Sequence, residues 1–144
     1  VHRLYRGRSF FQKKFHVKEI YNHSRYHDSH KRYDVALVLL DGWVRISRAV
    51  QPIQLPVQGD RINIGKRCYM TGWGDTILGG KHSDILQRAR LIITSSRRCK
   101  ARNGATVHGS SMICAGGRGK SGCHGDSGGP LACYERGRWV LRGG

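Results

Sequence analysis

Short apolar runs, each bounded by Gly, Asp or Asn, dominate the hydrophobic pattern of this chain. β-Branched and aromatic residues are common in these runs, which is typical of strands and not of amphipathic helices. The pattern predicts strands over Phe15–Ile20, Asp34–Leu40, Cys68–Trp73 and Leu86–Thr94, and a hairpin of Pro130–Glu135 and Trp139–Leu141 that turns at Arg136–Gly137. We therefore expect an all-β protein.

Two segments depart from this pattern of short, bounded apolar runs. Asp34 is followed by the continuous apolar run Val-Ala-Leu-Val-Leu-Leu, and a strand without polar alternation is typically buried on both faces. We therefore expect the strand at 34–40 to be fully buried. The segment Ala115–Gly129 holds seven glycines in fifteen residues, which predicts a loop. Loops of this kind on a β scaffold commonly carry functional sites.

The clearest chemical signal is the segment Gly125–Pro130, with the sequence Gly-Asp-Ser-Gly-Gly-Pro. A serine hydroxyl attacks a carbonyl only when a base activates it and donors stabilise the oxyanion that forms. The glycine two residues before Ser127 allows its N–H to point at that oxyanion together with the N–H of Ser127. The segment also contains the Gly-x-Ser-x-Gly pattern of esterases, but their fold needs alternating helices that this sequence does not predict.

This segment resembles the nucleophile loop of the trypsin/chymotrypsin family of serine endopeptidases. Tyr33–Leu37 is similar to the family's Asn-Asp-Ile-Ala-Leu, and Val50–Pro56 to the segment that joins its two barrels. Three further segments of this chain resemble family segments and follow the family's order along the sequence: Cys68–Gly74, Ser111–Gly116 and Trp139–Leu141. The resemblance covers nearly the whole chain and implies an all-β, two-barrel chymotrypsin-like fold. In that fold, 1–49 is the remainder of an N-terminal barrel, 50–66 the connection, and 67–144 an incomplete C-terminal barrel.

The resemblance also implies roles for individual residues. Ser127 is the nucleophile, and Asp34 orients the catalytic histidine. The N–H groups of Gly125 and Ser127 form the oxyanion hole. Asp126 is the acid that pairs with the new N-terminus when the family is activated. The specificity pocket contains Ser121, Gly122 and His124, and Ser121 is its floor. An uncharged floor cannot pair with Arg or Lys, so the resemblance implies cleavage after apolar residues.

The family's catalytic histidine, in its Thr-Ala-Ala-His-Cys context, is not found before Asp34. We therefore expect a fragment of a longer serine endopeptidase, inactive by itself for want of that histidine. The alternative is a catalytically dead, basic homologue that binds polyanions or microbial surfaces. The intact loop around Ser127 favours the enzyme.

Five cysteines without a Cys-x-x-Cys pattern disfavour a zinc knuckle and favour disulfides in an oxidising compartment. The family pattern implies the pairs Cys68–Cys133 and Cys99–Cys114, and leaves Cys123 to pair with a residue outside the chain. We expect a secreted or extracellular protein, or one stored in secretory granules. Asn22 begins an Asn-His-Ser sequon for N-glycosylation. We expect no cofactor and no metal.

The charge balance is strongly basic, with 26 Lys and Arg against 9 Asp and Glu. Cations are concentrated in Arg6–Lys18 and again at Arg97, Arg98, Lys100 and Arg102. Such a surface attracts anions, so a sulfated glycan is a possible partner besides protein or peptide substrates. The basic runs match no nucleic-acid module, and no apolar run is long enough to cross a membrane. A solvated basic surface with no dedicated partner remains the simpler interpretation.

Overall fold

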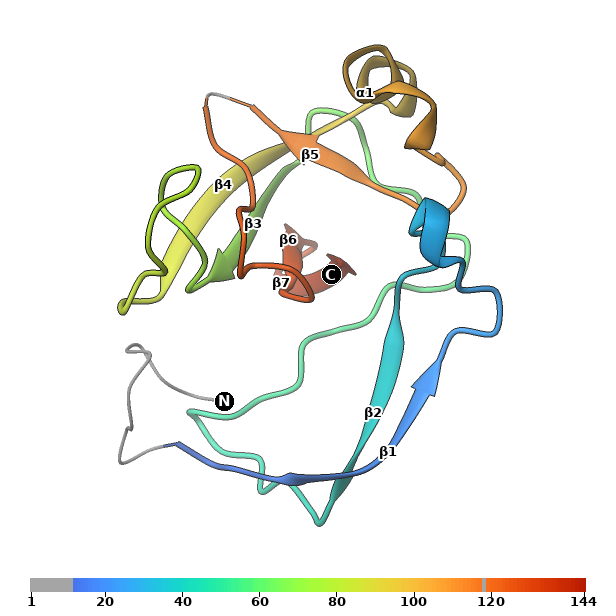
Figure 1. The fold of residues 1–144 in the computed structure, drawn as a ribbon. Coiled ribbons are helices and arrows are strands. Elements are labelled where there is room, and N and C mark those ends of the chain that lie inside the picture. Colours follow the sequence, from blue (N-terminus) through green and yellow to red (C-terminus); the bar gives the residue numbers. More distant parts are fainter. Residues whose placement is uncertain (1–11, 118) are drawn as a thin grey trace.

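The computed structural model describes residues 12–117 and 119–144, and its strands form two antiparallel sheets (Figure 1). The smaller sheet pairs β1 (His16–Asn22) with β2 (Ala36–Asp41). The larger sheet has the order β5-β4-β3-β6-β7, formed by Arg67–Gly72 (β3), Gln87–Thr94 (β4), Cys114–Gly116 (β5), Leu131–Glu135 (β6) and Arg138–Gly143 (β7). A mostly β, antiparallel architecture is confirmed. The first part of the basic segment Arg6–Lys18 lies outside the described residues.

The larger sheet is built around a disulfide. Cys68 on β3 lies directly opposite Cys133 on β6, and the two sulfurs are bonded. Both cysteines are fully buried and pack with Ile93 of β4. Partly buried side chains complete this core, namely Ile62, Ala115 and Leu131. The β6–β7 hairpin turns at Arg136 and Gly137, both with positive φ, as a two-residue hairpin turn requires.

The expectation that the strand at 34–40 is fully buried was wrong. Every residue of β2 except Leu40 is exposed, and the Leu37 side chain has 72% of its surface in solvent. An apolar sequence makes burial favourable, but burial also requires a second layer that covers the strand. Within the described residues, β1 is the only strand that pairs with β2, and β1 is itself exposed.

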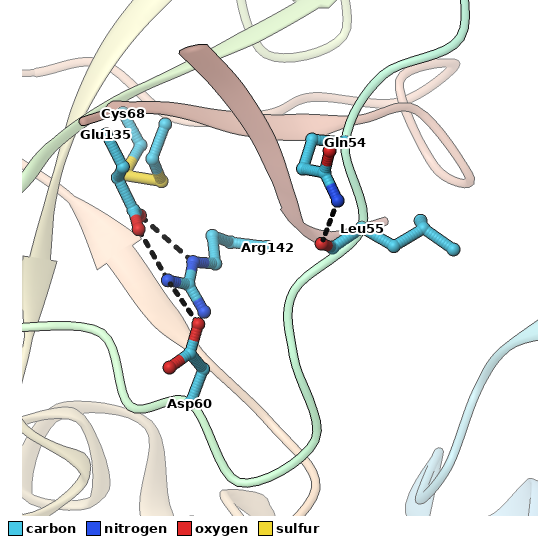
Figure 2. Close-up of polar contacts among 7 residues, drawn as sticks. Gln54, Leu55, Asp60, Cys68, Glu135 and Arg142 are labelled. Atoms are coloured by element: carbon cyan, nitrogen blue, oxygen red, sulfur yellow. Dashed lines mark hydrogen bonds and ion pairs between the residues drawn. A yellow bond between two sulfur atoms is a disulfide. The ribbon is translucent and has the colours of Figure 1, made fainter. Parts of the chain in front are cut away.

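The segment between the sheets is fastened to the larger one. Leu141 of β7 donates its N–H to the carbonyl of Gln54 at 2.9 Å, and Gln54 forms a parallel bridge with Val140. Figure 2 shows a second attachment, in which the Arg142 guanidinium lies between Glu135 and Asp60. Its Nε donates to Glu135 Oε1 at 2.9 Å, and Asp60 Oδ2 lies 3.7 Å from a terminal nitrogen.

One helix was missing from the sequence-based prediction. The helix α1 (Ser96–Asn103) begins after Ser95, whose hydroxyl accepts a hydrogen bond from the N–H of Arg98 at 3.2 Å. A serine at this N-cap position satisfies one of the unpaired donors of the first turn. A disulfide from Cys99 to Cys114 joins α1 to β5. Two short 3-10 helices, η1 (Asp28–His30) and η2 (Gly104–Thr106), complete the described elements.

Candidate active site

Asp34 and Ser127 line the same cleft, although they come from opposite halves of the chain. The cleft has a volume of about 1170 Å³, and Asp34 lies just before β2 while Ser127 lies within the glycine-rich segment before β6. Both residues are exposed, so a substrate could reach them. The fold thus brings the two residues that the family resemblance assigns as nucleophile and orienting acid to one opening.

The loop before Ser127 is held by tight backbone turns. The N–H of Asp126 donates to the carbonyl of Cys123 at 3.0 Å, and that of Gly129 donates to the carbonyl of Asp126 at 2.9 Å. Gly125 has a φ of 89°, a conformation that side chains rarely tolerate. No described residue accepts a hydrogen bond from the N–H of Gly125 or Ser127. Both N–H groups are therefore unpaired within the described part of the chain.

The Asp126 carboxylate points toward the end of β3. It accepts one hydrogen bond from the N–H of Gly74 at 2.9 Å and another from the N–H of Cys123 at 3.0 Å. A Cβ at position 74 would lie 2.6 Å from this carboxylate, and one at Gly72 would overlap it. Glycines at both positions are therefore needed for Asp126 to anchor the nucleophile loop in this way.

The backbone at Tyr33 leads Asp34 into the cleft through an unusual turn. Tyr33 has a φ of 52°, which is uncommon for a residue with a side chain, and its carbonyl accepts the N–H of Val35 at 2.8 Å. The Tyr33 ring stacks on His23 at 4.9 Å, and the Arg25 guanidinium lies 4.4 Å from its centre. These contacts hold the turn that places Asp34 at the cleft.

The three residues assigned to the specificity pocket also line this cleft. Gly122 lies against Met70, because a Cβ at position 122 would be 2.8 Å from the Met70 sulfur. Ser121 is exposed, and 85% of the His124 side chain is in solvent. The His124 ring stacks on His82, with 5.4 Å between the ring centres. The sequence analysis missed His82, because no motif links it to the nucleophile loop 42 positions later.

The remaining assigned residues are the five cysteines and Asn22, and of these only Cys123 lines the cleft. Cys68–Cys133 and Cys99–Cys114 are disulfide-bonded, the same pairs that the family pattern implies. Cys123 has no disulfide partner among the described residues and is half-buried. Asn22 is exposed at the end of β1.

Comparison with known proteins identifies the chain. The family model described as Trypsin matches residues 3–141, so the chain belongs to the trypsin family of serine proteases. Three curated relatives show the same likeness. The chain is 38% identical over 131 residues to coagulation factor XI of Bos taurus, covering 90% of this chain and 21% of that protein. It is 43% identical over 113 residues to chymotrypsin-like elastase family member 3A of Homo sapiens, covering 76% and 42%.

The third relative is transmembrane protease serine 9 of Rattus norvegicus, 44% identical over 130 residues that cover 88% of this chain and 12% of that protein. The chain thus spans less than half the length of each of these relatives. Family membership implies a chymotrypsin-like fold and protein substrates for the family. No helix in the described residues has the length and apolar character needed to cross a bilayer.

Proposed function

We propose that this chain carries the nucleophile half of a serine endopeptidase that cleaves peptide bonds through an acyl-enzyme. One observation carries the proposal: Ser127 lines the cleft that Asp34 also lines. No described residue accepts a hydrogen bond from the N–H of Ser127 or of the nearby Gly125, which supports their assigned role. In this proposal Ser127 attacks the scissile carbonyl, and the two N–H groups stabilise the resulting oxyanion. Asp34 orients the histidine that takes the serine proton. The family relationship supports these roles.

The proposed fold assigns β1 and β2, within 1–49, to the N-terminal barrel. Residues 50–66 are the connection, and 67–144 with the five-stranded sheet belong to the C-terminal barrel. Asp126 is the acid that pairs with a new N-terminus on activation. Its two backbone hydrogen bonds already hold a negative charge beneath the nucleophile loop, which supports this role.

The test uses the complete gene product and a serine-directed fluorophosphonate. We expect one label per molecule at Ser127 and hydrolysis of peptide substrates, and we expect Ser127→Ala to abolish both. A loss of about 10³-fold or more is typical when a triad member is removed. Hydrolysis that survives Ser127→Ala would assign the activity to another residue and refute the proposal.

By themselves, these 144 residues are proposed to be inactive. No histidine in the described residues forms a hydrogen bond with Asp34 or with Ser127, so none of these histidines is placed to take the serine proton. The expected result for this chain alone is no fluorophosphonate label. Stoichiometric labelling of Ser127 in this chain would contradict the proposed need for a histidine.

The proposed substrates carry an apolar residue before the scissile bond. Ser121 and Gly122 bring no charge to the cleft, and Met70 lies against Gly122, which supports an apolar pocket. A cationic side chain would be left there without a partner at Ser121. Peptides that differ only at this residue test the preference in the complete enzyme. We expect Leu, Phe or Ala to be cleaved faster than Arg or Lys, and the reverse order would reject the assignment.

We also propose a sulfated glycan as a second partner, bound at α1. This eight-residue helix exposes four cationic side chains and contains no acid, so it forms a compact positive surface: Arg97, Arg98, Lys100 and Arg102. Heparin-affinity chromatography tests it. Gln at Arg97, Arg98 and Lys100 should lower the eluting salt concentration more than Gln at three exposed cations that are far apart in the sequence, Arg45, Lys81 and Arg138. Equal shifts would indicate attraction by net charge alone.

Secretion is the last part of the proposal. The two disulfides are typical of proteins that fold in an oxidising compartment, and we propose that Cys123 pairs with a cysteine outside this sequence. Asn22 is exposed and is the proposed glycan attachment site. The secreted protein should therefore gain electrophoretic mobility on treatment with an N-glycosidase. Asn22→Gln should match the treated protein, and an unchanged mobility would remove this assignment.

A further inference from the structure

A cluster of two imidazoles and a carboxylate lies at the rim of the cleft. It consists of Asp75, His82 and His124. Within residues 12–117 and 119–144 it is the only group of three metal-ligating side chains whose donor atoms all lie within 4.8 Å of one another. The sequence analysis expected no metal because it searched for closely spaced motifs, whereas these three residues come together only in the fold.

The backbone fixes the three residues relative to one another. Asp75 forms an antiparallel bridge with His82, and its N–H donates to the carbonyl of His124 at 2.9 Å. Gly125 makes room for the cluster, because a Cβ there would lie 2.7 Å from the His82 ring. The site is therefore assembled by main-chain contacts that do not depend on a bound ion.

The three side chains are close enough to share one ion. His82 Nδ1 forms a hydrogen bond with Asp75 Oδ1 at 2.7 Å, which an ion would replace, and His124 Nδ1 lies 3.8 Å from the other carboxylate oxygen, Oδ2. Adjacent donors in a tetrahedral zinc site, with bonds of about 2.0 to 2.2 Å, stand roughly 3.3 Å apart, between the two observed separations. Small rotations of the exposed His124 ring would bring its donor to the required distance.

The chemistry of the donors selects the ion. Asp75 is partly buried and only 8% of its side chain is exposed, so its negative charge favours a cation beside it. Imidazole nitrogens suit borderline-soft ions such as Zn²⁺, whereas Ca²⁺ and Mg²⁺ prefer sites built from oxygen ligands alone. We propose that Asp75, His82 and His124 bind one Zn²⁺, with water in the fourth position. On binding, Nδ1 of each neutral imidazole donates its lone pair and the ring carries its proton on Nε2.

The proposed ion would join two loops that border the nucleophile. His124 directly precedes Gly125, whose N–H is assigned to the oxyanion, and Asp75 and His82 flank the exposed loop at 76–81. Zinc would therefore reduce movement of both loops. Its effect on peptide hydrolysis rests on the proposed function, but zinc binding itself does not. Binding and hydrolysis are measured separately, so failure of one is distinguishable from failure of the other.

The test is titration of this chain with ZnCl₂ by isothermal calorimetry, with thermal unfolding as a second measurement. We expect one equivalent bound and a higher melting temperature in zinc. His124→Asn should weaken binding at least about tenfold, the lower end of the loss when an outer-shell partner of a metal site is removed. Because His124 is 85% exposed, this substitution should leave the apo fold intact, which circular dichroism checks.

The matched control is the double substitution His27→Asn and His30→Asn. These rings also contact each other, with centres 5.1 Å apart, but no carboxylate completes a group of three there. The control should bind Zn²⁺ as the unchanged chain does. Equal binding by the His124→Asn variant, loss of binding in the control, or equal affinity for CaCl₂ would each overturn the proposed site.

Discussion

The two sheets of this molecule have similar apolar sequences but opposite environments. The five-stranded sheet buries Cys68, Ile93 and Cys133, and a disulfide cross-links two of its adjacent strands. The two-stranded sheet leaves Leu37 72% exposed and Ile20 58% exposed. Hydrophobicity therefore sets which residues can be buried, whereas the number of layers around a strand decides whether they are. The site is divided in the same way, with Ser127 on the well-packed side and Asp34 beside the exposed sheet.

The largest expected loss of stability comes from removing the disulfide of the five-stranded sheet. Replacing Cys68 and Cys133 with Ala opens a cross-link with a sequence separation of 65 residues. Chain entropy predicts a loss of about 4 kcal/mol in the free energy of unfolding, against about 3 kcal/mol for the 15-residue link from Cys99 to Cys114. Urea denaturation measures both. A larger loss for the shorter link would show that unfolded-chain entropy does not govern the stability of the sheet.

The next effect concerns Glu135, which holds the largely buried Arg142 (Figure 2). Glu135→Gln should lower the free energy of unfolding by about 1.5–3 kcal/mol, because hydrogen bonds to charged groups contribute that much. Asp60→Asn should cost less than about 1 kcal/mol, since Asp60 is half-exposed and 3.7 Å away. Similar losses for the two variants would contradict the ranking.

The same pair predicts a pH dependence. The hydrogen bond from Arg142 lowers the pKa of the Glu135 carboxyl below its ordinary value, so the unfolded chain binds this proton more readily. The stabilisation is complete above the ordinary pKa of Glu and is lost as pH falls through the lowered pKa. As pH is lowered, the free energy of unfolding should therefore fall less steeply in Glu135→Gln than in the unchanged chain. An identical pH dependence of the two proteins would exclude this contribution of Glu135.

A substitution at Gly74 tests the junction between β3 and the nucleophile loop. A Cβ there meets both the Asp126 carboxylate and the carbonyl of His124, so Gly74→Ala should cost about 1–3 kcal/mol through overpacking. Gly116→Ala is the control, because its Cβ would meet nothing nearer than 4.0 Å. Urea denaturation of the two variants gives the difference, and equal stability would show that Asp126 moves aside without cost.

The smallest effects sharpen the comparison between the sheets. Ile93→Val removes one carbon from the core and should cost about 0.5–1.5 kcal/mol. Leu37→Ala removes three carbons from the exposed β2 and should change stability by no more than about 0.5 kcal/mol. Chemical denaturation compares the two. A larger loss for Leu37 would mean that β2 packs against a layer in solution.

The hydrophobic pattern predicted six of the seven strands, because their apolar runs and glycine boundaries are local features, and their ends differ from the observed ones by at most two residues. This pattern missed the strand β5, whose residues Ala115 and Gly116 contradict the prediction that the loop begins at Ala115. The helix α1 was missed because its polar residues show no helical periodicity, although Ser95 is a good N-cap and could have indicated it. The exposure of β2 depends on neighbours that a linear pattern does not describe.

The candidate site was predicted in part for a related reason. Ser127 and Gly125 lie within one contiguous motif, and the family pattern supplied Asp34. His82 reaches the same region only because a bridge to Asp75 folds the intervening loop back on itself. Contacts of this kind follow from tertiary structure, so no spacing in the sequence could have indicated that His82 and His124 stack.

The attachment of Gln54 to β7 also affects how molecules of this protein meet one another. An outer strand with free N–H and carbonyl groups can recruit a strand from another molecule and start aggregation. Here the carbonyl of Gln54 already occupies the N–H of Leu141 on the outer strand β7. The segment around Gln54 thus covers part of the edge of β7 and hinders its pairing with a strand of another molecule, in addition to linking the two sheets.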